Sequence, residues 1–168
     1  LFRGDQFLAG ESEDELYEKL KLSFIPPELR EDRGEIEAAE KDELPDLIEL
    51  GEIQGDLHCH TDATDGKAGL REMARAARDK GYKYVAFTDH AKALPVAGGL
   101  DEEGALKRAG EIRELDGKMD GIRLLAGIEV DILEDGSLDL GEDALAELDW
   151  IIASVHTNLG QDEERMTE

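Results

Sequence analysis

The stretch Tyr84-Val85-Ala86-Phe87-Thr88-Asp89-His90 is a short apolar run that ends in an acid and a histidine. Three other stretches share this pattern, and each closes on a histidine or a glutamate: Ile53–His58, Leu124–Glu129 and Trp150–His156. Apolar runs of this length are typical of strands buried in a parallel sheet. Because the carboxyl ends of neighbouring parallel strands meet at one rim, we expect these polar side chains to lie close together.

Helical patterns separate these runs. Leu70–Lys80 is a predicted helix with Met73, Ala74 and Ala77 inward and Gly81 at its end. The next predicted helix, residues 101–116, has apolar positions at Ala105, Leu106, Ala109, Ile112 and Leu115. Another short helix is expected over residues 142–148, and strands are expected over residues 53–58, 82–88, 122–128 and 150–155, the last of them a core strand. This alternation predicts right-handed βαβ units, a parallel sheet and an α/β fold.

The first 52 residues follow a different pattern. A hairpin is predicted around Gly4-Asp5, and Ser12 with Glu15 forms a capping box at the start of a helix. Pro26-Pro27 ends this unit, since proline cannot continue a helix. Residues 28–46 are charged, lack strong apolar periodicity and are interpreted as part of a linker. We therefore predict a small α+β unit over residues 1–24, a linker over 25–52 and the α/β domain over 53–168.

Composition limits the class of protein. The chain has 168 residues, of which 40% are apolar, enough for one modest domain with or without an appendage. There is no apolar run of about 18 residues, so no membrane span is expected. The single cysteine, Cys59, excludes an internal disulfide and indicates a reducing cytoplasm. The start at Leu1 without Met, and a helix-like pattern that is still running at Glu168, lead us to expect a piece of a longer chain.

The formal charge is −24, from 43 acidic and 19 basic residues. Such an excess marks either an acidic tail that binds a partner or the solvated surface of a halophilic protein. The acids are spread along the chain and alternate with apolar helical positions, which favours the halophilic surface. A charge of this sign repels a polyanion at low salt, and a Debye length of ~3 Å at 1 M salt screens most of that repulsion.

All four histidines, His58, His60, His90 and His156, stand at the ends of the predicted strands or just beyond them. His58 and His60 are two residues apart, so in a strand they project to the same face. Neutral imidazoles suit Zn²⁺, Mn²⁺ or Fe. A single strand-end histidine is more often a structural residue with ordinary hydrogen bonds, but the conjunction of four favours a metal cluster.

Acidic residues complete the predicted cluster. Asp65 is either a carboxylate ligand or a turn former before Gly66. Glu129 can bridge two metals ~3.5–4 Å apart, which one imidazole nitrogen cannot do; the alternative is a solvent-facing acid.

Three further residues near the strand ends have possible supporting roles. Asp89 either orients a metal-bound imidazole or caps its strand, and Asp131 is a candidate acceptor on the same face as Glu129. Lys92 either touches a substrate phosphate or is a plain surface lysine. No Gly-x-Ser-x-Gly elbow and no P-loop is present, and Cys59 faces away from the histidines.

These elements together resemble the PHP (polymerase and histidinol phosphatase) family. The motifs that carry the resemblance are Asp56–Thr61, Asp65-Gly66, Phe87–His90, Gly127–Glu129 and Ala153–His156. The likeness is closer still to the PHP domain of bacterial and archaeal family X DNA polymerases, and residues 1–24 resemble the end of the polymerase thumb. The segments typical of that subgroup are Ile25–Glu31, Gly34–Ala39, Asp89–Leu94, Val96–Leu100 and Gln161–Glu168.

The resemblance implies a distorted, TIM-like (β/α)7 barrel with a cluster of three divalent ions, Mn²⁺ or Zn²⁺. About four of the seven βα units would be present, and further ligands would lie beyond residue 168. By position in the family motifs, the implied metal ligands are His58, His60, Asp65, His90, Glu129 and His156. Of these, His58, His60, Glu129 and His156 are the implied catalytic residues.

The resemblance also implies an activity. A metal-dependent phosphoesterase is expected, acting on DNA as a 3′-to-5′ exonuclease or 3′-end processing enzyme beside a repair polymerase, through metal-activated water. Two alternatives stay open: a small-molecule phosphatase of the histidinol-phosphatase type, and a non-catalytic module that buttresses the polymerase. A single stretch of this length would carry an incomplete cluster and no polymerase centre.

Overall fold

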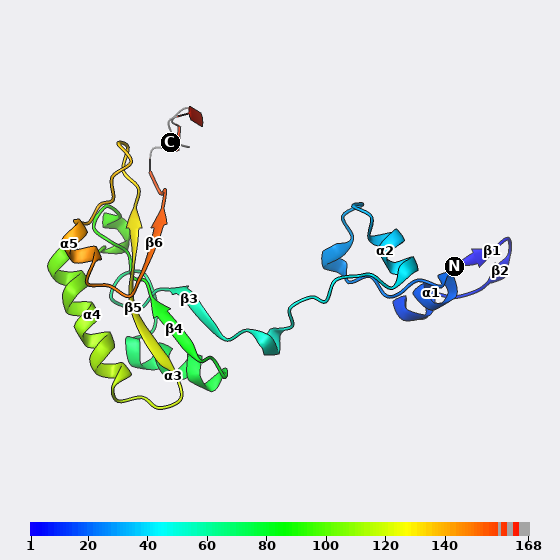
Figure 1. The fold of residues 1–168 in the computed structure, drawn as a ribbon, viewed down its shortest axis with the longest axis horizontal. Helices are drawn as coiled ribbons and strands as arrows, with labels where there is room; N and C mark the ends of the chain where they lie inside the picture. Colours follow the sequence, from blue (N-terminus) through cyan, green and yellow to red (C-terminus); the bar gives the residue numbers. More distant parts are fainter. Residues whose placement is uncertain (158, 161–162, 165–168) are drawn as a thin grey trace. The chain divides into compact units, whose positions relative to one another are not determined.

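The computed structural model describes residues 1–157, 159–160 and 163–164. Most of the closing stretch that resembles family X polymerases, residues 161–168, therefore lies outside the described residues. The chain divides into two compact units, with the boundary between Leu50 and Gly51 (Figure 1). Each unit has its own secondary structure and its own buried side chains.

The first unit begins with a hairpin and a capped helix, as the sequence predicts. Strands β1 (Phe2–Arg3) and β2 (Gln6–Phe7) pair antiparallel, and helix α1 spans Glu13–Leu20. The Ser12 hydroxyl accepts the Glu15 N–H at 3.1 Å, which confirms the N-cap. The Glu15 carboxylate, however, accepts the N–H groups of Gly10 and Glu11 rather than that of Ser12, so the reciprocal half of the capping box is replaced.

The segment interpreted as linker contains structure that apolar patterning does not reveal. A 3₁₀ turn, η1, covers Pro27–Leu29, and helix α2 covers Glu35–Lys41. This short helix buries only Ala39, so it has no apolar stripe to detect. Its start is stabilised locally, because the Glu35 carboxylate accepts the N–H groups of Asp32 and Arg33.

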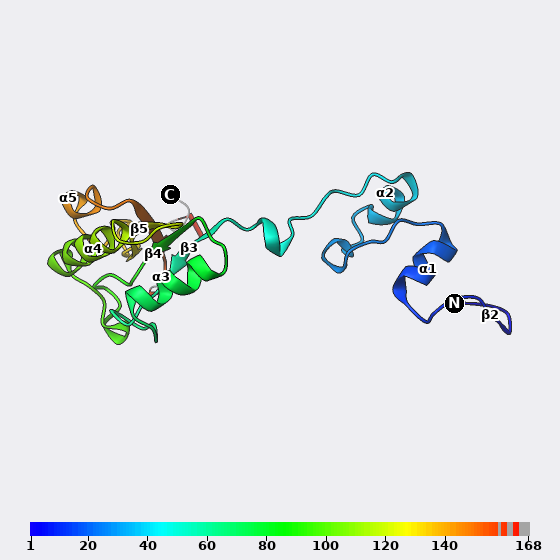
Figure 2. The ribbon, with the colours of Figure 1, turned by 90° about the horizontal axis from the view of Figure 1, so that it is seen from below.

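The second unit contains a four-stranded sheet in which every pairing is parallel. Helices connect the strands in chain order, and the strands lie side by side in that same order (Figures 1 and 2). The strands are β3 (Gly55–Cys59), β4 (Tyr84–Phe87), β5 (Arg123–Asp131) and β6 (Trp150–Ser154). The helices are α3 (Leu70–Asp79), α4 (Glu102–Asp116) and α5 (Glu142–Leu145), with 3₁₀ turns η2 (Leu50–Glu52) and η3 (Pro95–Ala97). This arrangement confirms the predicted α/β class and a partial TIM-like barrel.

Helices α3, α4 and α5 pack on one face of the sheet. Alternate residues of β4 and β5, such as Phe87 and Leu124, are buried against α3 and α4, and Ile128 is buried against α4 and α5. Side chains of opposite parity, including Glu129 and Asp131, therefore lie on the other face. The pleat separates a packing face from a face that can carry chemistry.

Strand β6 differs from its prediction. Its apolar sequence predicts a core strand, but within the part of the chain that the structure describes it pairs with β5 alone and forms an edge of the sheet. Trp150 and Ile151 are accordingly 37% and 38% exposed. The apolar composition of β6 shows that its side chains are suited to burial, but the position of the strand in the sheet determines how far they are buried.

Candidate metal centre

The end of β3 delivers two histidines to the face opposite the helices. The pairing register of β3 with β4 shifts between Asp56 and Cys59, and the Asp56 carboxylate accepts the His58 N–H at 3.0 Å within this stretch. The rings of His58 and His60 lie 5.2 Å apart. Cys59, between them, points to the packing face, and its thiol contacts the carbonyl of Ala86 at 3.2 Å. Burial raises the pKa of Cys59 to about 12, so the thiol stays protonated at neutral pH and serves packing.

The turn after β3 brings Asp65 to the same place. The Gly66 N–H donates to the carbonyl of Thr61 at 2.9 Å, and a Cβ at Gly66 would lie 2.6 Å from the carbonyl oxygen of His60. Only glycine allows this close approach. Asp65 then sits with Oδ1 2.9 Å from Nδ1 of His60 and Oδ2 3.4 Å from Nε2 of His90. The hydrogen bond with His60 lowers the pKa of Asp65.

Glu129 lies at the centre of the histidines. Its Oε2 is 3.3 Å from Nε2 of His58, 3.1 Å from Nε2 of His60 and 3.1 Å from Nδ1 of His90. Its other oxygen, Oε1, is 3.6 Å from Nε2 of His156. The carboxylate is only 4% exposed, so its own oxygens are shielded from water, whereas the His58 side chain is 44% exposed.

The environment of Glu129 favours its ionised form. The Ser154 hydroxyl donates to Oε1 at 2.6 Å. Burial raises the pKa of Glu129, but the hydrogen bonds from Ser154 and His58 and the charge of His90 outweigh burial and leave the pKa below its usual value. A buried carboxylate that stays ionised and is surrounded by imidazoles is a suitable ligand for a cation.

Backbone hydrogen bonds hold the strand ends together at this point. The Glu129 N–H donates to the carbonyl of Asp89 at 3.1 Å, and the Ala91 N–H donates to the carbonyl of Glu129 at 2.8 Å. His90 lies between these two bonds and is buried. At the end of β6, His156 has Nδ1 2.5 Å from Oδ1 of Asp131, which fixes the orientation of its ring.

The six predicted ligands therefore converge on one rim of the sheet. Their donor atoms form three groups in which all atoms lie within 4.8 Å of one another: His58, His60 and Glu129; His60, Asp65 and His90; His90, Glu129 and His156. Imidazole nitrogens with carboxylate oxygens are the donor set of Zn²⁺, Mn²⁺ and Fe sites. Shared members link the three groups, so the residues present fit neighbouring metal ions.

Comparison with known proteins agrees with this geometry. Residues 56–168 match the PHP domain, and this stretch contains all six converging side chains. The chain belongs to the PHP domain family. None of the described helices is long and apolar enough to cross a membrane.

The relatives of this chain include a DNA polymerase with exonuclease activity in its name and several probable phosphatases. A "DNA polymerase/3'-5' exonuclease PolX" of Bacillus subtilis is 47% identical over 152 residues, which is 90% of this chain and 26% of that protein. A "probable phosphatase" of a Thermoanaerobacter species is 40% identical over 104 residues, and one of Vibrio vulnificus is 34% identical over 107 residues. These matches cover 60% and 62% of this chain and 40% and 41% of the relatives, so the chain spans less than half of the length of each.

Asp89 and Lys92, for which the sequence predicts supporting roles, lie outside the cluster of six converging side chains. The Asp89 carboxylate points to the packing side, where it contacts Thr61 and Arg108 rather than an imidazole. Lys92 pairs with Glu102 at 2.6 Å on the surface. Asp131, by contrast, accepts from an imidazole of the cluster, as its parity with Glu129 predicts.

Sequence reasoning missed Ser154 and Arg108. Strands β5 and β6 pair Asp131 with Ser154, so these two side chains lie on the same face of the sheet, which is also the face of Glu129. The sequence of one strand does not reveal this register. Arg108 carries a signal that could have been found, since it lies three residues from the buried Ala105 and next to the buried Ala109 on α4. A charged residue on a buried helical stripe predicts an ion pair.

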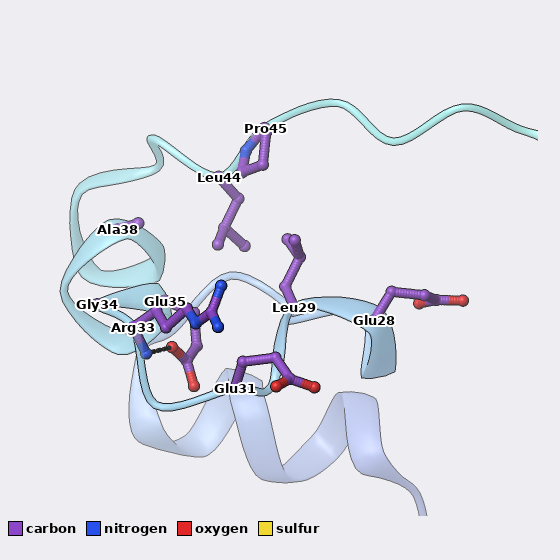
Figure 3. Close-up of a pocket in the computed structure, with 9 residues that line it drawn as sticks. All are labelled: Glu28, Leu29, Glu31, Arg33, Gly34, Glu35, Ala38, Leu44 and Pro45. Carbon is purple, nitrogen blue, oxygen red and sulfur yellow. Dashed lines mark hydrogen bonds between the residues drawn. The ribbon is translucent and has the colours of Figure 1, made fainter. Parts of the chain in front are cut away.

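The first unit contains a pocket whose lining residues differ in type from those of the metal centre. It has a volume of about 320 Å³ and lies beside η1 and α2, with Leu29 and Leu44 pointing into it (Figure 3). Its polar side chains are those of Glu28, Glu31, Arg33 and Glu35. The residues that line it include no histidine, and its acids are not among the groups of converging donor atoms described above.

Proposed function

We propose that this chain carries the catalytic metal centre of a phosphodiester hydrolase that removes nucleotides from DNA 3′ ends, as a 3′-to-5′ exonuclease or end-processing activity. The observation that supports this best is the buried, ionised Glu129 within 3.1–3.6 Å of nitrogens from four histidines. Membership of the PHP family and the activity in the name of the Bacillus relative support the choice of reaction.

Three divalent ions, Mn²⁺ or Zn²⁺, are proposed for this centre, and their ligands would be drawn from the six residues of the three linked groups. When bound, such ions supply a nucleophilic water of lowered pKa and offset charge on the phosphate oxygens. Glu129 would serve as the shared carboxylate, since it belongs to two of the groups and each of its oxygens faces a different histidine.

The chain's own residues prepare the centre for that role. Asp131 holds Nδ1 of His156, which leaves Nε2 directed at Glu129. Asp65 contacts both His60 and His90, so one turn residue links two strand ends. Preorganised ligands reduce the reorganisation needed when an ion and a phosphate arrive. The His58 side chain is 44% exposed, which makes it the histidine of the group that is most open to substrate.

The extent of the matches favours DNA over a small ester. The match to the Bacillus polymerase and exonuclease is longer than the stretch from residue 56 to residue 168, so it extends into the first unit. The matches to the two probable phosphatases described above, over 104 and 107 residues, are shorter than that stretch. A small-molecule phosphatase is the second candidate, supported by the names of those relatives.

The assay is hydrolysis of single-stranded DNA labelled at its 3′ end, with Mn²⁺ added, by protein expressed from the natural reading frame. Release of the label with the first nucleotide removed is expected, together with its suppression by a chelator and in His58→Ala. Hydrolysis of a phosphate monoester without DNA hydrolysis would favour the phosphatase. Full DNA hydrolysis by His58→Ala and by Glu129→Ala would remove the proposal.

The charge of −24 predicts an unusual salt dependence for DNA hydrolysis. Raising the salt from 0.01 to 1 M shortens the Debye length from ~30 to ~3 Å, which screens repulsion between the acidic chain and DNA. We expect KM for DNA to fall, or stay level, over this range. A steep rise of KM with salt, the behaviour of proteins that bind phosphates through many Lys and Arg side chains, would contradict this.

A further inference from the structure

A buried ion pair lies on the helix side of the strand ends, away from the metal centre. Asp89, at the end of β4, is 1% exposed, and Nε of Arg108 on α4 lies 3.2 Å from its Oδ2. The Arg108 side chain is itself only 13% exposed. Within the described part of the chain, Arg108 is the cation that contacts this carboxylate, so it compensates a charge that water cannot reach.

Asp89 uses its remaining acceptor capacity on the turn that carries two metal ligands. It accepts the Thr61 N–H at 2.6 Å, the Thr61 hydroxyl at 2.8 Å and the Thr64 hydroxyl at 3.2 Å. Thr61 directly follows His60, and Thr64 directly precedes Asp65. Asp89 itself directly precedes His90. One carboxylate thus touches the chain beside three of the six proposed ligands.

Arg108 closes this network from the other side. Its Nη2 donates to the Thr61 hydroxyl oxygen, whose own proton goes to Asp89. Its Nη1 donates to Glu111 at 2.9 Å, one turn further along α4. The planar guanidinium therefore makes three directed bonds, a geometry that a lysine ammonium cannot reproduce.

The pleat explains why Arg108 can act on ligands that it does not touch. Side chains alternate along an extended chain, so His60 and His90 point to one face while Thr61 and Asp89 point to the other. Fixing Thr61 and Asp89 fixes the backbone from which the imidazoles project. Removing a residue that hydrogen-bonds to a metal ligand often lowers the affinity for the metal 10- to 100-fold.

We propose that Arg108 is a positioning residue of the metal centre, acting through Asp89 and Thr61 to hold His60, Asp65 and His90 in register. This inference rests on the proposed function, because it assigns Arg108 a part in the same centre. Arg108 contacts neither substrate nor metal in this role. Its effect should therefore be visible in how the site binds an ion, before any substrate is added.

The test compares Co²⁺ binding by the full chain, its Arg108→Ala and Arg108→Lys variants, and a Lys107→Ala control. Lys107 adjoins Arg108 on α4, but its side chain is 78% exposed and only approaches Glu111, at 4.0 Å. The visible absorption of Co²⁺ reports both the affinity and the ligand geometry of the bound ion. Circular dichroism establishes that each variant is folded at the temperature of the titration.

Both Arg108 variants should bind Co²⁺ about 10- to 100-fold more weakly and give an altered absorption band for the bound ion, whereas Lys107→Ala should match the parent chain. A role in stability alone would reduce the folded fraction but leave the band of bound Co²⁺ unchanged, and this result would overturn the proposal. If Arg108→Ala does not fold, Arg108→Lys still decides, because it keeps the charge and loses the forked bonds.

Hydrogen exchange at the Thr61 amide separates this inference from the proposed function. The amide is buried against Asp89, so its exchange should speed up at least tenfold in Arg108→Lys and stay unchanged in Lys107→Ala. A parent chain that binds no Co²⁺ would overturn the proposed function and, with it, the positioning role. Binding by the parent with unchanged affinity, band and Thr61 exchange in the Arg108 variants would overturn the positioning role alone.

Discussion

Replacing Glu129 by Gln is expected to abolish tight binding of Mn²⁺ and to reduce phosphodiester hydrolysis at least 1,000-fold. Glutamine keeps the shape of the side chain and removes its charge. Metal-ion catalysis contributes several kcal/mol of charge stabilisation, and each 1.36 kcal/mol is a factor of ten, so loss of ~4 kcal/mol corresponds to ~1,000-fold. Glu129 is central because its oxygens face nitrogens from four histidines, and both linked groups that contain it lose a ligand together.

The matched control for this substitution is Glu103→Gln. Glu103 lies exposed in the first turn of α4, so the same change of charge there should leave Mn²⁺ binding and hydrolysis unchanged. Binding is measured by calorimetry, and hydrolysis by release of a 3′ label. Retention of tight Mn²⁺ binding by Glu129→Gln would show that the carboxylate is not a ligand.

Phe87→Ala is expected to destabilise the second unit by about 3–5 kcal/mol, the usual cost of removing a buried phenylalanine. Phe87 is 0% exposed in the middle of the sheet and packs among residues of α3, α4 and β5. Domains are commonly stable by only about 5–15 kcal/mol, so this loss removes a large share of the stability. The strand ends that carry the histidines would lose their support at the same time.

The single tryptophan allows this loss to be measured in the second unit alone. Trp150 lies in β6, so its fluorescence during urea unfolding reports on the sheet rather than on residues 1–50. Leu106→Ala is the control, because Leu106 is 41% exposed on α4 and should cost about 1 kcal/mol or less. Equal midpoints for the two variants would mean that Phe87 is not part of the core that holds the unit together.

The convergence of the metal-binding residues could be predicted from the sequence because it follows from local rules. Each strand is marked by its own apolar run, and parallel strands must end at the same rim. The sequence therefore predicts, without knowledge of strand order, that the side chains at these strand ends lie close together, namely those of His58, His60, Glu129 and His156. The strand order of the sheet supplies what those rules omit, such as the place of Ser154 beside Glu129.

Features that depend on three-dimensional packing were less predictable. The expected apolar face of α4 included Leu106, which is exposed, and passed over Arg108, which is nearly buried. Helical periodicity puts residues 105, 108, 109 and 112 on one stripe, so position outweighed residue type here. Helix α2 was missed because local caps, rather than an apolar stripe, stabilise it.

The most direct test of the metal centre is anomalous X-ray scattering from crystals of this chain grown with Mn²⁺. The predicted result is anomalous density beside the Glu129 carboxylate, in contact with the imidazoles of His58, His60, His90 or His156. Anomalous density only at surface carboxylates, with the four imidazoles free of it, would contradict the account.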